Sequence, residues 1–126
     1  MILSKLAAAM LVVSVAAGPL VEPDNAAFRQ MSLTQKNAAL QPLMRRATEC
    51  IARTVATDPR FRKDAPTDNL GDLIVESMAN CTVPVRAMID AYDRYFGDGT
   101  GEVFFMGPYL DVLPTAVSRQ AVELAP

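Results

Sequence analysis

The clearest pattern along the chain is an apolar repeat that begins just after Pro42. Large or small apolar residues recur there at every fourth position: Leu43, Ala47, Ile51 and Val55. This spacing places them on one face of a half-buried helix. Proline suits the first turn of a helix, whereas a residue that precedes proline avoids helical backbone angles. The pattern therefore predicts a helix that begins at Pro42 and ends at Thr57-Asp58-Pro59.

Three further segments follow. Apolar residues three and four positions apart favour a helix from about Leu70 to Cys81, although DLIVES within it is also compatible with a short strand. Another helix is predicted from the Thr82-Val83-Pro84 segment to Gly97, since glycine commonly stops a helix. A last helix is predicted to begin, or to be kinked, at Pro114. Between Gly97 and Pro114 lie the glycine-rich run GDGTG and the apolar run VFFMGPYLDVL.

These segments predict an all-α fold. We expect a small bundle of three to four helices, with a glycine-rich loop before the C-terminal helix. The chain length of 126 residues fits one domain, which we place at residues 42–126. Residues 18–41 have few apolar positions, so they are predicted to form a partly ordered N-terminal arm.

Residues 1–17, MILSKLAAAMLVVSVAA, have the layout of a secretory signal peptide. Lys5 precedes an uncharged apolar run, and small residues follow it, so we expect cleavage after Ala17. Retention as an uncleaved anchor is the alternative, but the apolar run is shorter than the roughly 20 residues that span a bilayer. The interpretation is therefore a periplasmic or secreted protein that has no membrane segment once the signal is removed.

The chain has two cysteines, Cys50 and Cys81. In an oxidising compartment they can form one intramolecular disulfide, which we expect. Closing a loop of about 30 residues would stabilise the fold by roughly 3 to 4 kcal/mol in the chain-entropy model. The alternatives are two buried free thiols, an intermolecular bridge or a redox pair, although redox-active cysteines commonly lie only two residues apart.

The chain contains no histidine, and its 14 acidic residues exceed its 12 basic residues. The missing histidine removes the commonest general base and the commonest transition-metal ligand. We therefore expect neither catalytic activity nor a cofactor; an enzyme that uses only carboxylates or a thiol is the alternative. The slightly acidic balance argues against a nucleic acid as partner, because phosphate binding requires a basic surface.

Two groups of acids have spacings that resemble cation sites. One lies along a predicted helix face: Asp68, Asp72 and Glu76. Acids early in a helix also complement its dipole and remain solvated, which is the preferred interpretation. The other is the run GDGTGE, but as a calcium loop it would need ligands at positions occupied by Arg94 and Phe105. We therefore expect no metal site in either group.

Two candidate partner surfaces remain. Six of the eight aromatic residues lie close together in the sequence: Tyr92, Tyr95, Phe96, Phe104, Phe105 and Tyr109. A small chain needs such side chains for its core, so core packing is preferred and a partner groove beside Gly107-Pro108 is the alternative. The second candidate is a basic patch in the run RFRK, formed by Arg60, Arg62 and Lys63.

Together these patterns favour a non-enzymatic binding or interaction module of the cell envelope. Its partner would be a protein or a small apolar ligand, and its oligomeric state is open. A short, exported, helical chain with two cysteines is similar in outline to periplasmic acid-stress chaperones. That similarity implies a second hypothesis, a chaperone-like protein that responds to acid or stress.

Overall fold

The computed structural model describes residues 25–126, and the side chains from Ala27 onward. The predicted signal peptide, residues 1–17, and the beginning of the predicted N-terminal arm lie outside the described residues. Within residues 25–126 the chain forms helices and no strand, which confirms the all-α prediction. No helix in this part of the chain is both long and apolar enough to cross a bilayer.

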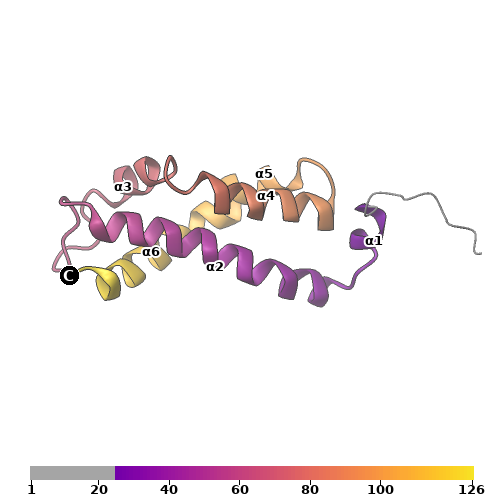
Figure 1. Ribbon diagram of the computed structural model, residues 1–126, viewed down its shortest axis with the longest axis horizontal. Helices are drawn as coiled ribbons and strands as arrows, with labels where there is room; N and C mark the ends of the chain where they lie inside the picture. The colour runs from indigo at the N-terminus through magenta and orange to yellow at the C-terminus, as the bar shows by residue number, and fades with distance from the viewer. Residues whose placement is uncertain (1–24) are drawn as a thin grey trace, which may run out of the picture.

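The helices follow one another with short connections. In chain order they are α1 (Asn25–Arg29), α2 (Leu33–Thr57), α3 (Leu70–Ser77), α4 (Thr82–Phe96), α5 (Thr100–Phe104), the π-helix η1 (Phe105–Tyr109) and α6 (Leu110–Leu124). Figure 1 shows that α2 extends along most of the molecule, with α3 and the C-terminus near one end and α1 and α5 near the other. Both α4 and α6 pack against α2.

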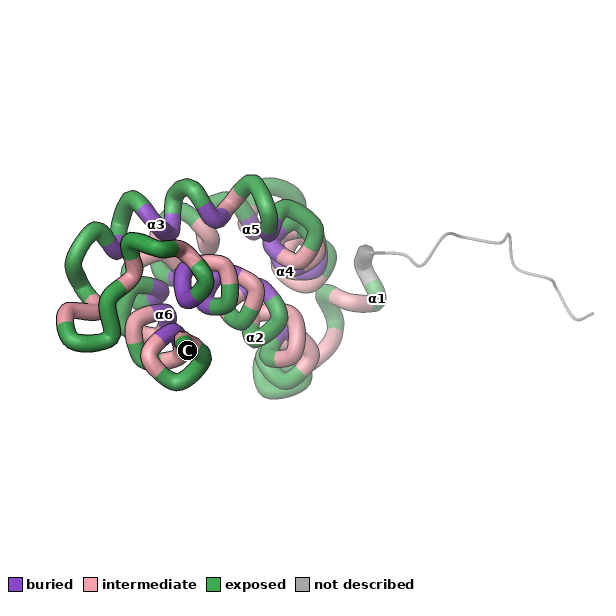
Figure 2. The backbone as a smooth tube through the Cα atoms, turned by 60° about the vertical axis from the view of Figure 1, so that its left-hand side comes forward, coloured by how far each residue is buried: buried purple, intermediate pink, exposed green. Residues whose placement is uncertain are grey.

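The core lies where α2, α4 and α6 meet, and Figure 2 shows the buried residues on the inner faces of these helices. Its largest fully buried apolar side chains come from all three helices: Ile51, Val55, Met88, Leu113 and Val117. The four-residue repeat of α2 is therefore the core face that the sequence predicts. At this face the apolar sides of three helices, α2, α4 and α6, pack against one another.

Helix α2 begins at Leu33 and not at Pro42, so the predicted start is wrong. Ser32 caps the helix: its hydroxyl accepts a hydrogen bond from the Gln35 N–H at 3.1 Å, and the Gln35 side chain accepts one from the Ser32 N–H at 3.0 Å. This reciprocal capping box stabilises the first turns. Leu40 is buried and anchors the turn before Pro42, so the helix passes through a proline that would otherwise favour a helix start.

The region between α3 and α4 also differs in detail from the prediction. Helix α3 ends at Ser77, and Cys81 lies at the N-cap of α4, not in the last turn of α3. The predicted stop of α4 is confirmed, because Gly97 has a φ of 115°, which a side chain would disfavour.

The segment before Pro114 is helical, so the last helix begins before this proline and not at it. The glycine-rich connection is confined to residues 97–99, and α5 begins at Thr100. Pro108 lies inside η1 and Pro114 lies inside α6. In η1 the Leu110 N–H donates to the Phe105 carbonyl, five residues back. A π turn of this kind allows the helical path to continue past Pro108, which has no N–H to donate.

Candidate functional site

A pocket of about 550 Å³ opens on the surface where α4 ends and α5 begins. Its lining comes from the end of α4, the connection at residues 97–99, α5 and η1: Tyr92, Phe96, Asp98, Gly99, Thr100, Val103, Phe104 and Pro108. The volume falls in the range of about 300 to 1,000 Å³ that is usual for small-molecule sites. Most of the lining is apolar, which makes this pocket the candidate functional site.

The apolar wall of the pocket is a stack of three aromatic rings. The ring of Tyr92 lies 4.4 Å from that of Phe104, centre to centre, and the two planes differ by 8°. On α4 itself, the ring of Phe96 lies 4.6 Å from that of Tyr92. The stack therefore joins α4 to α5, and all three rings remain only half-buried.

Asp93 fixes the start of α5 against α4. Its carboxylate accepts a hydrogen bond from the Gly101 N–H at 2.7 Å, and its own backbone carbonyl accepts one from the Gly97 N–H at 2.7 Å. The Thr100 hydroxyl donates to the Gly97 carbonyl as well. These bonds satisfy polar groups at the end of one helix and the beginning of the next.

The two helices approach each other most closely at Gly101, which is buried. A Cβ atom at this position would lie 2.8 Å from Asp93 Oδ1 and would clash with the Ile89 carbonyl oxygen. Only glycine permits this approach, and the approach positions Phe104 against Tyr92. The pocket therefore depends on a residue that does not line it.

The structure divides the six predicted surface aromatics. Three of them line the pocket, whereas Tyr95 makes an edge contact with Phe28 of α1, with ring centres 5.6 Å apart. Phe105 is half-buried and stacks on Tyr109 at 5.6 Å. Tyr109 is buried in the core, and this burial raises the pKa of its hydroxyl. Consecutive Phe104 and Phe105 thus contact different neighbours.

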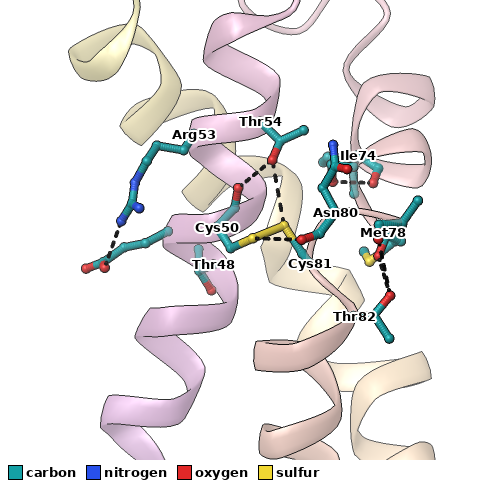
Figure 3. Close-up of a disulfide and its surroundings, with 12 residues drawn as sticks. Thr48, Cys50, Arg53, Thr54, Ile74, Met78, Asn80, Cys81 and Thr82 are labelled. Atoms are coloured by element: carbon teal, nitrogen blue, oxygen red, sulfur yellow. Dashed lines mark hydrogen bonds and ion pairs between the residues drawn. A yellow bond between two sulfur atoms is a disulfide. The ribbon is translucent and has the colours of Figure 1, made fainter.

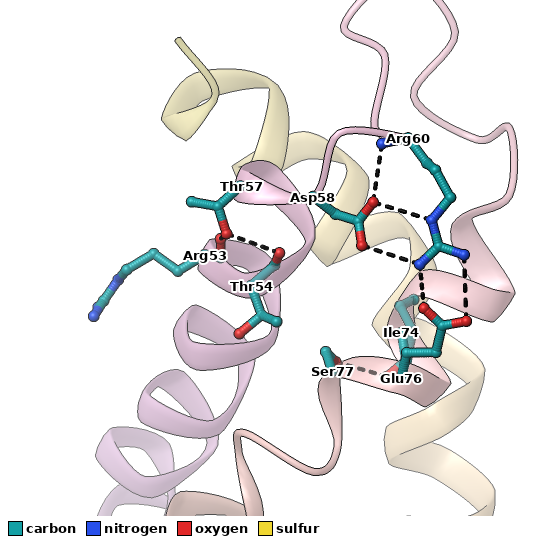
Figure 4. Close-up of polar contacts among 8 residues, drawn as sticks. All are labelled: Arg53, Thr54, Thr57, Asp58, Arg60, Ile74, Glu76 and Ser77. Atoms are coloured by element: carbon teal, nitrogen blue, oxygen red, sulfur yellow. Dashed lines mark hydrogen bonds and ion pairs between the residues drawn. The ribbon is translucent and has the colours of Figure 1, made fainter.

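Two residues of the predicted basic patch are paired with acids. Arg60 forms ion pairs with Asp58, at 3.0 Å, and with Glu76, and it thereby connects the end of α2 to α3, as Figure 4 shows. The Arg60 guanidinium holds the pKa of both carboxyls below their usual values. Arg62 pairs in the same way with Asp64, at 2.9 Å. Much of the positive charge of this patch is therefore matched within the chain.

The acidic groups singled out in the sequence have no arrangement suited to a metal. The three acids predicted on one helix face do not share it, because Asp68 lies before α3 begins at Leu70, and Glu76 faces Arg60. Across residues 25–126, no three or more His, Cys, Asp or Glu side chains are grouped so that they could hold a metal ion.

Cys50 and Cys81 form the predicted disulfide, with their Cα atoms 5.8 Å apart. Figure 3 shows the bridge between the middle of α2 and the start of α4. The side chain of Cys81 is fully buried, and Cys50 is half-buried. The bridge lies in the body of the bundle, and none of the pocket-lining residues belongs to it.

Sequence reasoning did not identify Val103 or Gly101 as residues of a site. The available signal was the glycine-rich run placed directly between two aromatic pairs, which permits a tight connection and a ring stack. Lys36 was missed as well; its Nζ lies 5.0 Å from the centre of the Phe96 ring.

Comparison with known proteins identifies no relative. No family model matches the chain, and no curated protein or solved structure is significantly similar to it.

Proposed function

We propose that this protein is a non-enzymatic binding module of the cell envelope that takes a small apolar ligand into the pocket between α4 and α5. One observation carries the proposal. The wall of an open pocket of about 550 Å³ is a stack of three aromatic rings. These rings would contribute most to the stability of the fold if they were buried. An apolar hollow of this size on a small protein is typical of a ligand site.

The pocket is held in place before any ligand enters. Asp93 fixes the start of α5, and the close approach at Gly101 holds the rings together. Ordering the wall would therefore cost little free energy when a ligand binds, which favours binding.

Export to an oxidising compartment is the second part of the proposal. The Cys50–Cys81 bridge supports it, because such bridges persist mainly outside the reducing cytoplasm. We expect the mature protein to begin at Gly18 and to be lighter than its reduced form by two hydrogen atoms. Mass spectrometry of protein recovered from the periplasm or the medium tests this; a full-length chain with two thiols would contradict it.

Binding is tested by adding benzyl alcohol, a neutral aromatic probe, and following backbone amide shifts by NMR. We expect saturable shifts that concentrate at Gly99, Thr100 and Val103. A tryptophan introduced at Val103 should fill the mouth of the pocket, since this lining residue is 72% exposed. The Val103→Trp variant should therefore lose the shifts.

Val83→Trp is the matched control. Val83 is also an exposed helical valine, at 81%, but it lies in the first turn of α4 and lines none of the pocket. Loss of the probe shifts in the Val103 variant alone supports the proposal. Shifts scattered over the surface, or equal responses from the two variants, would overturn it.

A further inference from the structure

We propose that the ligand of this pocket is a small organic cation, an ammonium group carried on an aromatic or alkyl body. This inference rests on the proposed function and names the class of its ligand. It combines the ring stack, which suits the body of such a molecule, with the charges that surround the pocket.

The chain segment that forms most of the pocket is acidic. Asp98 is the only charged residue among those that line the pocket. The segment from residue 90 to residue 103, which carries the end of α4 and the start of α5, has one basic residue, Arg94, against four acids: Asp90, Asp93, Asp98 and Glu102. A cationic ligand would be attracted to this surface and an anionic one repelled.

The helix ends at the pocket do not reverse this preference. The C-terminal end of α4 carries the negative end of its dipole, which favours a cation. The N-terminal end of α5 would favour an anion, but its Gly101 N–H is already bonded to the Asp93 carboxylate. Its Thr100 N–H is bonded to the Gly97 carbonyl at 3.1 Å. Two of the donors that an anion would need are therefore occupied.

The aromatic stack itself already has a cation beside it. Lys36 Nζ lies 5.0 Å from the centre of the Phe96 ring, within the distance at which ring faces attract ammonium groups. This contact shows that one ring of the wall is accessible to a positive group. The Lys36 charge would also oppose a second cation nearby, so removing that charge should strengthen binding of a cationic ligand.

The expected size of the charge effect is modest, because Asp98 is exposed to solvent. Measured energies for exposed ion pairs correspond to roughly a two- to fivefold change in affinity. The apolar wall supplies the rest of the affinity, which is why a neutral analogue should still bind more weakly at the same place.

The test compares three soluble probes with the same phenyl body: benzyltrimethylammonium, neutral benzyl alcohol and anionic phenylacetate. Each is titrated by NMR into the full protein at about 20 mM salt, where surface charges are little screened. We expect shifts at Gly99 and Thr100 for the cation and the alcohol, with the cation bound several-fold more tightly. At about 500 mM salt the difference should shrink.

Two variants assign the effect to charge. Asp98→Asn should weaken benzyltrimethylammonium by roughly two- to fivefold and should affect benzyl alcohol much less. Lys36→Gln should change the affinity for the cation in the opposite direction. Neither substitution alters the Tyr92–Phe104 stack, so the alcohol serves as the internal control.

The outcomes separate this inference from the proposed function. Equal affinity for cation and alcohol, tighter binding of phenylacetate, or a cation preference unchanged by Asp98→Asn would overturn the cation inference and leave the pocket as an apolar site. No localised binding of any of the three probes would overturn both.

Discussion

The buried hydroxyl of Tyr109 donates a hydrogen bond to Thr48 Oγ1, across a distance of 3.0 Å. The distance alone allows either oxygen to be the donor. The Thr48 hydroxyl, however, already donates its single hydrogen to the Met44 carbonyl, at 2.8 Å. Tyr109 is therefore the donor, and its bond attaches η1 to the middle of α2.

Thr48→Val should destabilise the fold more than its small change in shape suggests. Valine keeps the volume of threonine but leaves the buried Tyr109 hydroxyl without its acceptor, which costs about 1 to 3 kcal/mol. Tyr109→Phe removes the hydroxyl itself, so no buried donor is left without an acceptor. This substitution should cost only about 1 kcal/mol. Urea unfolding measures both, with Thr57→Val as control, because the exposed Thr57 hydroxyl bonds only within its own helix. Equal costs at Thr48 and Thr57 would contradict the assignment.

The same tyrosine predicts a loss of stability at alkaline pH. Burial raises the pKa of Tyr109 above its ordinary value of 10.0. Above that pH the unfolded chain releases this proton while the folded chain retains it, so the free energy of unfolding falls as pH rises. Urea midpoints between about pH 8 and about pH 11 should fall less steeply for Tyr109→Phe. Parallel curves for the two proteins would exclude this contribution.

Gly101→Ala should separate α5 from α4. The new Cβ meets the Ile89 carbonyl and the Asp93 carboxylate, so the expected cost is about 1 to 3 kcal/mol. The aromatic wall should loosen, and benzyl alcohol should bind more weakly. Gly107→Ala is the control, since nothing lies within 4 Å of a Cβ there, and it should be neutral or slightly stabilising. Retention of both stability and probe binding in the Gly101 variant would contradict the role given to this contact.

Removal of the disulfide should cost about 3 to 4 kcal/mol in the chain-entropy model. The double variant Cys50→Ala with Cys81→Ala tests this by urea unfolding, beside the parent protein with and without a reductant. Reduction should bring the parent close to the variant and leave the variant unchanged. A parent that is insensitive to reductant would contradict a stabilising bridge.

Stability should also fall in acid. Arg60 lowers the pKa of Asp58 and of Glu76 below their ordinary values of 3.8 and 4.5. The stability that these pairs contribute is present above those values and is lost as pH falls through the lowered ones. In Arg60→Gln, NMR titration should show both pKa values shifted upward, whereas Arg62→Gln should move only that of Asp64. Unchanged values in the Arg60 variant would refute the pairing.

That acid titration also bears on the chaperone hypothesis. A rise in the fluorescence of 8-anilinonaphthalene sulfonate as the Arg60 pairs are lost would favour exposure of apolar surface under acid stress. A flat response down to acid pH would count against it.

The parts of the fold that the sequence predicted are those set by local spacing. The repeat that contains Ile51 and Val55 has the period of a helix, so both the helix and its buried face could be predicted. The bridge could be predicted because Cys50 and Cys81 allow one intramolecular pairing. Neither inference requires knowledge of how distant segments meet.

Two of the errors arose at prolines, where other contacts override the local preference. Pro42 normally favours a helix start, yet the capping box at Ser32 and the buried Leu40 carry α2 through it. The motif Ser32-Leu33-Thr34-Gln35 was the available signal. Pro108 also lies inside a helix, where the wide turn of η1 accommodates its missing donor.

The pocket could not be predicted because it depends on an approach between two helices. The sequence shows that the aromatics cluster and that a glycine-rich run separates Phe96 from Phe104. Only the structure shows that Gly101 sets the spacing and that Tyr109 lies in the core instead of at the pocket.

The wide turn of η1 rotates the helical segment about its own axis, so the parts before and after the turn face two different helices. Before it, α5 faces α4 through Gly101, and after it, α6 faces α2 through Leu113. One residue corresponds to a rotation of about 100° about a helix axis. A regular α-helix through residues 105–109 would turn one of these faces away from its partner. The extra residue therefore lets a single continuous segment close the core at one end and build the pocket at the other.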